Sequence, residues 1–226
     1  TANFTRIETG ESGAKLIGDA HVVQNADGGA EVVLDGNRDY VALGRIKELE
    51  ASQQFNLSLD FQRSDVDSGA ERMVWNHKKF GVTLQDDALH IHVANTDNKV
   101  FEIANAGVGD TDKHSLNVAV DAEADRLQVV LDGKVLLDEQ DTDLDFVGVG
   151  GNEWGWSIGT AWNRFYEGSV SDFQLDDQAV FVEDGATQPK APDIEPSTDE
   201  SAASETVEEP VEEAPAPQES DTLDSV

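Results

Sequence analysis

The chain has 226 residues, with 47 acidic against 15 basic side chains and no cysteine. A net charge of −32 repels nucleic-acid phosphates and anionic lipid surfaces, which excludes both as partners. The absence of cysteine excludes disulfide frameworks and thiolate chemistry. No apolar run approaches the roughly 18 residues of a membrane span, so membrane insertion is not expected.

The composition changes sharply near Asp184. All six prolines follow this point, the last aromatic residue is Phe181, and residues 184–226 carry 13 acids and a single base. Such a segment cannot bury enough apolar surface to offset its chain entropy. We therefore expect one folded domain over residues 1–183 and a disordered, acidic, proline-rich linker or binding tail over residues 184–226.

Short apolar–polar alternations dominate the first 183 residues and predict β-strands. Asp-Gly pairs and other polar turns separate them, as at Asp35-Gly36 and Asp132-Gly133. The predicted strands, in chain order, cover residues 30–34, 40–43, 55–61, 80–84, 88–93, 115–120, 126–131, 134–137, 146–150, 156–159 and 169–175. Residues 45–52 alone have a helical pattern, and residues 73–79 are expected to form a loop between two strands.

About a dozen short strands without long helical crossovers favour an all-β fold, a two-sheet antiparallel β-sandwich of the jelly-roll type. A domain of 183 residues is long enough to bury a substantial core. It carries 34 acids against 14 bases. An acidic surface keeps a protein soluble at high salt, so the composition suits a marine or salt-adapted bacterial source. Like charge disfavours self-association, which predicts a monomer.

The ordered series of motifs resembles the laminin-G-like, concanavalin-A-like jelly-roll domains over residues 15–182. The segments that carry this resemblance are residues 30–41, 55–61, 79–84, 114–120, 126–135 and 167–175. The resemblance implies a β-sandwich but leaves the function open. The family includes sugar-binding modules, adhesion domains, structural spacers and, more distantly, glycosidases.

Catalysis is not expected. Glycosidases of this fold present carboxylates on one strand with Glu-x-Asp-x-(x)-Glu spacing, and the chain lacks that spacing. There is no Gly-x-Ser-x-Gly elbow and no glycine-rich phosphate loop. A hydrolase or lyase acting on a polysaccharide stays open, because residues far apart in the chain can converge.

The sequence contains candidate ligands for two kinds of metal site. His90 and His92 lie on one face of a predicted strand and could bind zinc or copper, but no third ligand is evident nearby and an exposed polar face is the preferred explanation. Calcium prefers carboxylate and carbonyl oxygens, which the alternating acids Asp65 and Asp67 could supply. In many carbohydrate-binding jelly rolls an aspartate of the last strand helps to hold a structural Ca²⁺. The resemblance places Asp172 in that role, with carbonyls near Asp19.

All four tryptophans fall in two polar stretches that suit a sugar ligand. A tryptophan face packs against the C–H face of a sugar, and amide, guanidinium and ammonium groups pair with its hydroxyls. Trp75 and Trp154 are expected to be exposed and Trp156 to lie in the core. The candidate ligand-binding residues are Trp75, Asn76, His77, Lys78, Asn152, Trp154, Trp162, Asn163 and Arg164.

These observations favour a non-catalytic, extracellular binding module for glycans, with a structural calcium. We interpret it as excised from a larger secreted or surface protein, whose partner is a cell-surface or matrix polysaccharide. The alternative is a structural or adhesion spacer of a large bacterial adhesin without a small ligand.

Overall fold

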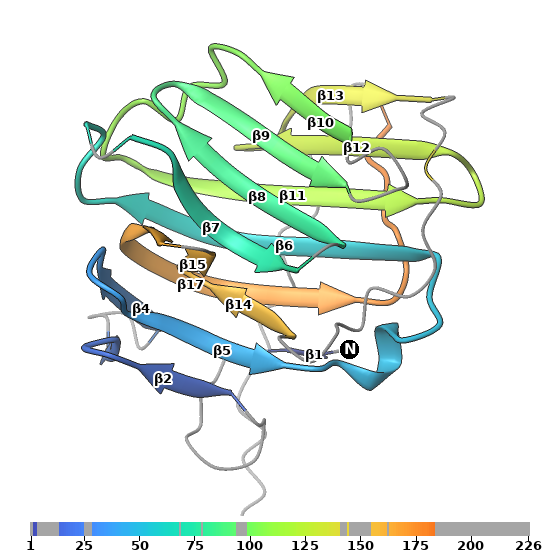
Figure 1. Ribbon diagram of the computed structural model, residues 1–226. Coiled ribbons are helices and arrows are strands. Elements are labelled where there is room, and N and C mark those ends of the chain that lie inside the picture. Colours follow the sequence, from blue (N-terminus) through green and yellow to red (C-terminus); the bar gives the residue numbers. More distant parts are fainter. Residues whose placement is uncertain are drawn as a thin grey trace, which may run out of the picture. The chain divides into compact units, whose positions relative to one another are not determined.

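The alternation of Phe55, Leu57, Leu59 and Phe61 puts four apolar side chains on one face of a strand, where none is more than 2% exposed. This strand lies near the middle of one of two antiparallel sheets seen in the computed structural model (Figure 1). The structure describes residues 2–3, 14–24, 29–67, 69–77, 79–93, 99–140, 144, 155–161 and 163–183, within the compact unit Thr1–Gln188.

In the described part of the chain, one sheet has eight strands. Its order is β13-β12-β11-β6-β17-β4-β3, and β1 pairs with β17 beside this path. All these pairs are antiparallel. The strands are β1 (Ala2–Asn3), β3 (His21–Gln24), β4 (Ala30–Asp35), β6 (Gln54–Arg63), β11 (Lys113–Asp121), β12 (Arg126–Leu131), β13 (Lys134–Glu139) and β17 (Glu167–Asp176).

The second sheet has seven strands among the described residues, in the order β10-β9-β8-β7-β14-β5-β2, and lies in front in Figure 1. A separate two-stranded sheet joins β15 (Thr160–Ala161) to β16 (Arg164–Phe165). The strands of the seven-stranded sheet are β2 (Lys15–Ile17), β5 (Tyr40–Gly44), β7 (Glu71–Asn76), β8 (Phe80–Gln85), β9 (Ala88–Val93), β10 (Lys99–Ile103) and β14 (Trp156–Ile158).

An aromatic cluster fills the space between the sheets. The rings of Phe55 and Phe80 meet edge to face at 4.9 Å between centroids, and the indole of Trp156 lies 6.1 and 5.9 Å from them. Trp156 has no exposed surface, which confirms its prediction as a core residue. Burial of such side chains supplies much of the free energy that holds the two sheets together.

A buried ion pair also lies between the sheets. Arg63 Nε donates to Glu71 Oε2 at 2.7 Å, and both side chains are at most 1% exposed. The other guanidinium nitrogen atoms donate to the carbonyls of Asp86, Val108 and Val66. The second carboxylate oxygen accepts the backbone N–H of Glu167 at 3.2 Å. The ion pair thus joins β6, β7, β17 and three connecting segments.

The structure confirms the predicted fold class and corrects part of the element assignment. Residues 73–76 belong to strand β7, so the expected loop over residues 73–79 is wrong there. The sequence hides this strand because a buried Glu71 begins it. Residues 45–52 contain one turn of 3₁₀ helix, η1 (Lys47–Leu49). The predicted strand over residues 146–150 lies outside the described residues.

The described residues include no helix long and apolar enough to cross a membrane. The predicted boundary between domain and tail near Asp184 stays a prediction, because the described part of the chain ends at Glu183.

Candidate functional site

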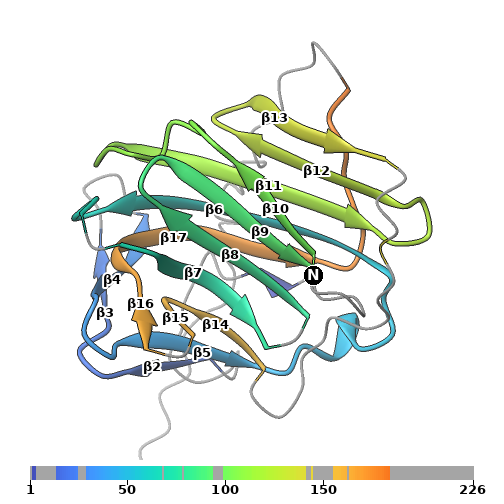
Figure 2. The ribbon, with the colours of Figure 1, turned by 45° about the horizontal axis from the view of Figure 1, so that its top comes forward.

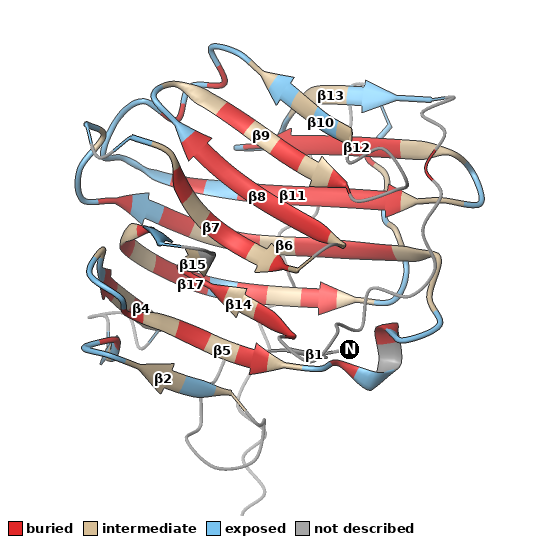
Figure 3. Ribbon diagram, in the orientation of Figure 1, coloured by how far each residue is buried: buried red, intermediate tan, exposed pale blue. Residues whose placement is uncertain are grey.

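The seven-stranded sheet turns every second side chain away from the eight-stranded sheet. Along β9 the burial alternates, with Leu89, Ile91 and Val93 buried and His90 and His92 partly exposed (Figure 3). The pairing register carries this alternation across the neighbouring strands. We call the outward surface of this sheet the Trp75 face; its centre consists of Arg72, Trp75, Gly81, Thr83, His90 and His92.

Trp75 lies flat across the neighbouring strand. A Cβ atom built on Gly81 of β8 would fall 2.2 Å from two ring carbons of the indole, so the glycine makes room for the ring. The Cζ atom of Arg72 lies 4.4 Å from the centroid of the same ring, within the range of a cation–π contact. Trp75 as a whole is partly exposed, and its Nε1 atom is buried.

His92 borders the indole on its other side. Its ring meets Trp75 edge to face at 5.2 Å between centroids, and its Nε2 lies 3.1 Å from Thr83 Oγ1. Burial lowers the pKa of His92 to about 4, with further lowering from Arg72, His90 and Arg164. The imidazole is therefore neutral at neutral pH and can both donate and accept a hydrogen bond.

Strands β15 and β16 contact β7 and bring Arg164 to this region (Figure 2). Arg164 is exposed and follows Asn163, whose φ of 60° makes the turn between the two strands. Burial lowers the pKa of Arg72, and the positive charge of Arg164 lowers it further.

The predicted ligand-binding residues separate into three groups. Trp75 and Arg164 come together, and Asn163 adjoins them in the chain. Asn76 is 0% exposed and points between the sheets, so its side chain does not reach the Trp75 face. His77 is partly exposed in the turn after β7. The predicted residues Lys78, Asn152, Trp154 and Trp162 lie outside the described residues.

The sequence did not single out Arg72, Gly81 and Thr83. A β-bulge in β7 shifts the register between Arg72 and Val74, which places Arg72 and Trp75 on one face although they are three residues apart. Strict alternation would have put them on opposite faces. The Lys-Phe-Gly sequence before Val82 gave no sign that its glycine lies under an indole.

The outer face of the eight-stranded sheet differs from the Trp75 face, because a C-terminal segment of the chain covers part of it. We call residues 177–183 the C-terminal strap. Gln128 of β12 accepts the backbone N–H of Val182 at 2.7 Å and donates to its carbonyl at 2.9 Å. The backbone N–H of Ala179 donates to Gln54 Oε1 at 3.1 Å. Gln128 is thereby only 1% exposed although it points outward.

The four predicted calcium ligands lie in three separate parts of the chain. Asp19 follows β2, and Asp65 and Asp67 lie after β6, where Asp65 Oδ1 accepts the backbone N–H of Asp67 at 2.9 Å. Asp172 is exposed at a bulge of β17, with φ of 51°. In the part of the chain that the structure describes, no three His, Asp or Glu side chains are grouped to hold a metal ion.

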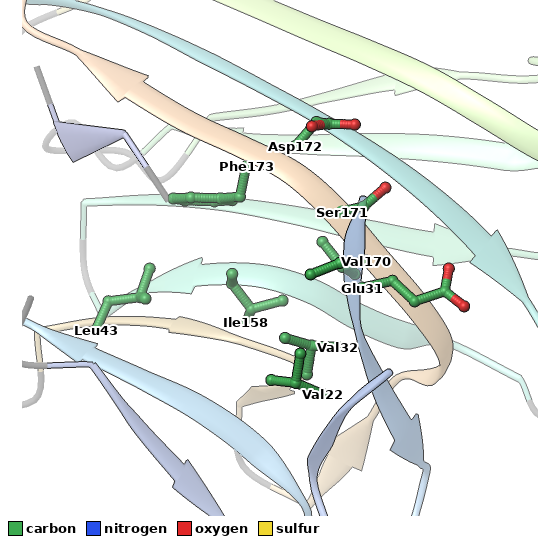
Figure 4. Close-up of a pocket in the computed structure, with 10 residues that line it drawn as sticks. Val22, Glu31, Val32, Leu43, Ile158, Val170, Ser171, Asp172 and Phe173 are labelled. Atoms are coloured by element: carbon green, nitrogen blue, oxygen red, sulfur yellow. The ribbon is translucent and has the colours of Figure 1, made fainter. Parts of the chain in front are cut away.

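A small cavity lies beside Asp172. Apolar side chains from both sheets point into it, among them Val32, Ile158 and Val170 (Figure 4). It encloses about 20 Å³, which is room for little more than one water molecule. The cavity is too small for a sugar ring.

No protein-family model matches the chain, and no curated protein matches it. Solved structures do share its fold. The receptor binding domain of a botulinum neurotoxin C/D mosaic serotype superposes with a TM-score of 0.58 at 11% identity, covering 74% of this chain and 43% of that chain. The binding domain of Paraclostridial Mosquitocidal Protein 1 gives 0.61 at 10% identity, covering 80% and 48%.

A third structure is matched over most of its length. It is domain 4 of AbnA, a GH43 extracellular arabinanase from Geobacillus stearothermophilus, in complex with arabinotriose. The TM-score is 0.55 at 14% identity, and the match covers 73% of this chain and 78% of that domain. These likenesses support the jelly-roll-like β-sandwich, while the laminin-G-like resemblance stays a resemblance.

Proposed function

We propose that residues 1–183 form a non-catalytic carbohydrate-binding module that holds a glycan on the Trp75 face. The observation that carries the proposal is the indole of Trp75, which packs on Gly81, has the guanidinium of Arg72 over its ring and meets His92 edge to face. The indole and the stacked guanidinium together offer a surface for a sugar ring, and the polar groups offer hydrogen bonds to its hydroxyls.

The matched structures support this choice of ligand class. One of them contains arabinotriose, one is the receptor binding domain of a botulinum neurotoxin, and one is the binding domain of a mosquitocidal protein. A cell-surface or matrix polysaccharide is therefore the proposed partner, and the proposed location is outside the cell.

The chemistry of the face also favours binding over catalysis. Glycoside hydrolysis usually needs two carboxyl groups about 5 to 10 Å apart across the scissile bond. Among the described residues, the guanidinium of Arg72 and the imidazole of His92 contact the indole of Trp75. These groups can orient and hold a sugar without cleaving it.

A structural calcium is a separate part of the proposal. Calcium also accepts backbone carbonyls and water as ligands, so Asp172 or the Asp65–Asp67 turn needs no cluster of carboxylates around it. An ion bound only by the folded chain raises the unfolding temperature by mass action. We expect CaCl₂, but not MgCl₂ at equal ionic strength, to raise the midpoint measured in EDTA.

The direct test is a glycan array probed with the full chain, with and without calcium. We expect binding to one class of glycan, and Trp75→Ala should weaken it about thirtyfold, as for a central aromatic contact worth about 2 kcal/mol. Phe181→Ala is the matched control, because Phe181 packs against an arginine at 4.3 Å on the opposite face. Full binding by the folded Trp75 variant, or binding to no glycan, would leave the spacer alternative.

A further inference from the structure

His114 is a nearly buried titratable side chain held between two aspartates. It is the second residue of β11, it pairs with Phe61 on the inner face of the eight-stranded sheet, and 8% of its side chain is exposed. Its Nδ1 lies 2.8 Å from Asp132 Oδ2, and its Nε2 lies 3.0 Å from Asp110 Oδ1. Both nitrogen atoms of one imidazole therefore face carboxylate oxygens.

The turn between β12 and β13 holds Asp132 in place. Asp132 and Gly133, which form this β12–β13 turn, have φ of 50° and 76°. Asp132 donates its backbone N–H to the carbonyl of Ser115 at 2.8 Å, and its Oδ1 accepts the backbone N–H of Ser115 at 2.8 Å. Asp132 is thus bound to β11 on both sides of its Cα atom and presents its other oxygen to His114.

Asp110 comes from a different segment, residues 104–112, which we call the β10–β11 loop. Its Oδ1 also accepts the backbone N–H of Asp112 at 2.9 Å. The earlier half of the loop is fixed elsewhere, because Asp87 Oδ1 accepts the backbone N–H of Gly107 at 2.9 Å. The contact between His114 and Asp110 therefore connects the later half of the loop to β11 and, through Asp132, to the β12–β13 turn.

These contacts determine how many protons the ring carries. A carboxylate oxygen only accepts hydrogen bonds, and a neutral imidazole has a single N–H. Donation to both aspartates needs two N–H groups and hence a positive charge. Burial opposes this charge, but the hydrogen bonds to Asp132 and Asp110 outweigh it, so the pKa of His114 is raised. The backbone N–H of Asp112 and the bond to His114 lower the pKa of Asp110, which keeps its carboxylate ionised.

The segments that border His114 carry other charged groups, which are Asp60, Arg63, Asp86, Asp87, Asp112, Lys113 and Lys134. Lys113 forms an ion pair with Asp60 at 3.1 Å, and the guanidinium of Arg63 donates to Glu71. Histidine is the side chain whose ordinary pKa, about 6.5, lies closest to neutrality. Among the described groups of these segments, His114 is therefore the one that changes charge near neutral pH.

We propose that His114 is a pH-sensitive clamp, which joins the β10–β11 loop to the β12–β13 turn when it carries two N–H groups and releases the loop at Asp110 when it loses one proton. The neutral ring keeps its proton on Nδ1, because the turn fixes Asp132 and this contact is the shorter one. Its Nε2 then presents a lone pair to Asp110, and the two repel each other.

The release is local. Gln62 of β6 donates to the carbonyl of Thr111 at 2.9 Å, and Asp87 still holds the backbone of Gly107. Opening is therefore confined to the residues around Asp110. This clamp is independent of the glycan proposed for the Trp75 face.

The clamp has a defined effect on stability. Because the pKa of His114 is higher in the folded chain than its unfolded value of about 6.5, the folded state binds more protons between these two values. The stability that the clamp contributes is complete below about pH 6.5 and is lost as the pH rises through the folded pKa. This direction is opposite to that of His92, whose pKa is lowered to about 4.

The test is a pH titration of the histidine rings in the full chain by NMR, with spectra that correlate ring protons and ring nitrogen atoms. We expect both nitrogen atoms of His114 to be protonated below a midpoint that lies above about pH 6.5, and Nδ1 alone above it. His92, in the same spectra, is the internal reference and should be neutral near pH 7.

Two variants identify the clamp. Asp110→Asn removes the charge beside Nε2 and should lower the midpoint of His114 by about one pH unit. Asp112→Asn is the matched control, because it removes the same charge from the same loop, and its exposed side chain leaves the backbone N–H bond to Asp110 in place. Its midpoint should stay close to that of the unmodified chain.

The backbone amides report the release itself. Those of Thr111 and Asp112 should shift with the midpoint of His114 in the unmodified chain and stay constant over the same range in His114→Gln, whereas that of Gly107 should not follow the titration in either. A midpoint at or below about pH 6.5, equal midpoints for Asp110→Asn and the unmodified chain, or loop amides that ignore the titration would each overturn the proposal. The titration of the unmodified chain decides even where a variant fails to fold.

Discussion

Two arginine–aromatic pairs lie on opposite outer faces of the sandwich, and their geometry is nearly the same. Arg126 lies 4.3 Å from the ring centroid of Phe181, and Arg72 lies 4.4 Å from that of Trp75. Arg126 also donates to both carboxylate oxygens of Asp138, at 2.9 and 2.7 Å. These hydrogen bonds are the main reason why the pKa of Asp138 is lowered.

The difference lies in the charge that each arginine faces. Asp138 neutralises Arg126, and the C-terminal strap lies over the same part of the sheet through Gln128. Burial lowers the pKa of Arg72, and the positive charge of Arg164 lowers it further. The Arg126 pair therefore fixes a chain segment to the fold, whereas the Arg72 pair lies on the Trp75 face.

The largest expected effect comes from the inner side of β7, directly beneath the Trp75 face. Glu71→Gln should leave the buried guanidinium of Arg63 without its counter-charge and cost about 3–5 kcal/mol of unfolding free energy. Urea unfolding of the variant and of the unmodified chain measures this loss of unfolding free energy. Glu50→Gln, which breaks the exposed ion pair with Arg45, is the control and should change stability by less than about 1 kcal/mol.

Glycan affinity of the folded Glu71→Gln variant should match that of the unmodified chain. A stability loss as small as that of Glu50→Gln would show that the buried pair does not anchor β7.

Gly81→Ala should disturb the Trp75 face next most strongly. The added methyl group overlaps the indole, so the ring must move, at a cost of about 2–3 kcal/mol and most of the glycan affinity. A double-mutant cycle checks the cause, since Gly81→Ala should cost little once Trp75→Ala has removed the ring. Additive losses of stability would mean that the indole does not lie over Gly81.

On the opposite face, Gln128→Ala should loosen the strap. It removes the two hydrogen bonds to Val182 and leaves buried backbone groups unsatisfied, at a cost of about 1–2 kcal/mol. Hydrogen exchange at the amide of Val182 should become much faster, while glycan affinity stays constant. A matching loss of affinity would show that the two faces are coupled.

The smallest expected effect is a pH dependence from His92. Its pKa is about 4 in the folded chain and about 6.5 when unfolded, so the unfolded state binds more protons between these values. The unmodified protein should therefore lose stability as the pH falls from about 6.5 to 4. His92→Gln should remove that contribution, which solvent screening keeps below about 1 kcal/mol. Parallel pH-dependent profiles for both proteins would contradict this account.

The strands that the sequence predicted are those with clear alternation and deep burial, such as β6 and β11. The missed strands have weaker patterns. β2 and β3 lie at sheet edges and bury little of their side chains, so their sequences show no clean alternation. β7 was missed because a charged residue that is buried by pairing looks, in sequence, like a residue of a surface loop.

The candidate site was predictable only in part. Trp75 and Arg164 stood out because polar residues surround aromatic ones in both stretches. Their convergence depends on the strand order, which sets β7 beside β14 and brings the β15–β16 hairpin to it. Arg72 could not be placed with them, because the bulge that aligns it with Trp75 has no marker in the sequence.

The most direct test of the Trp75 face is an NMR titration of the full chain with the glycan that the array identifies. We predict amide shift changes concentrated on β7, β8, β9 and the β15–β16 hairpin, with β12, β13 and the strap unchanged. Shift changes centred on the strap, or none on β7, would contradict the assignment of the Trp75 face as the binding surface.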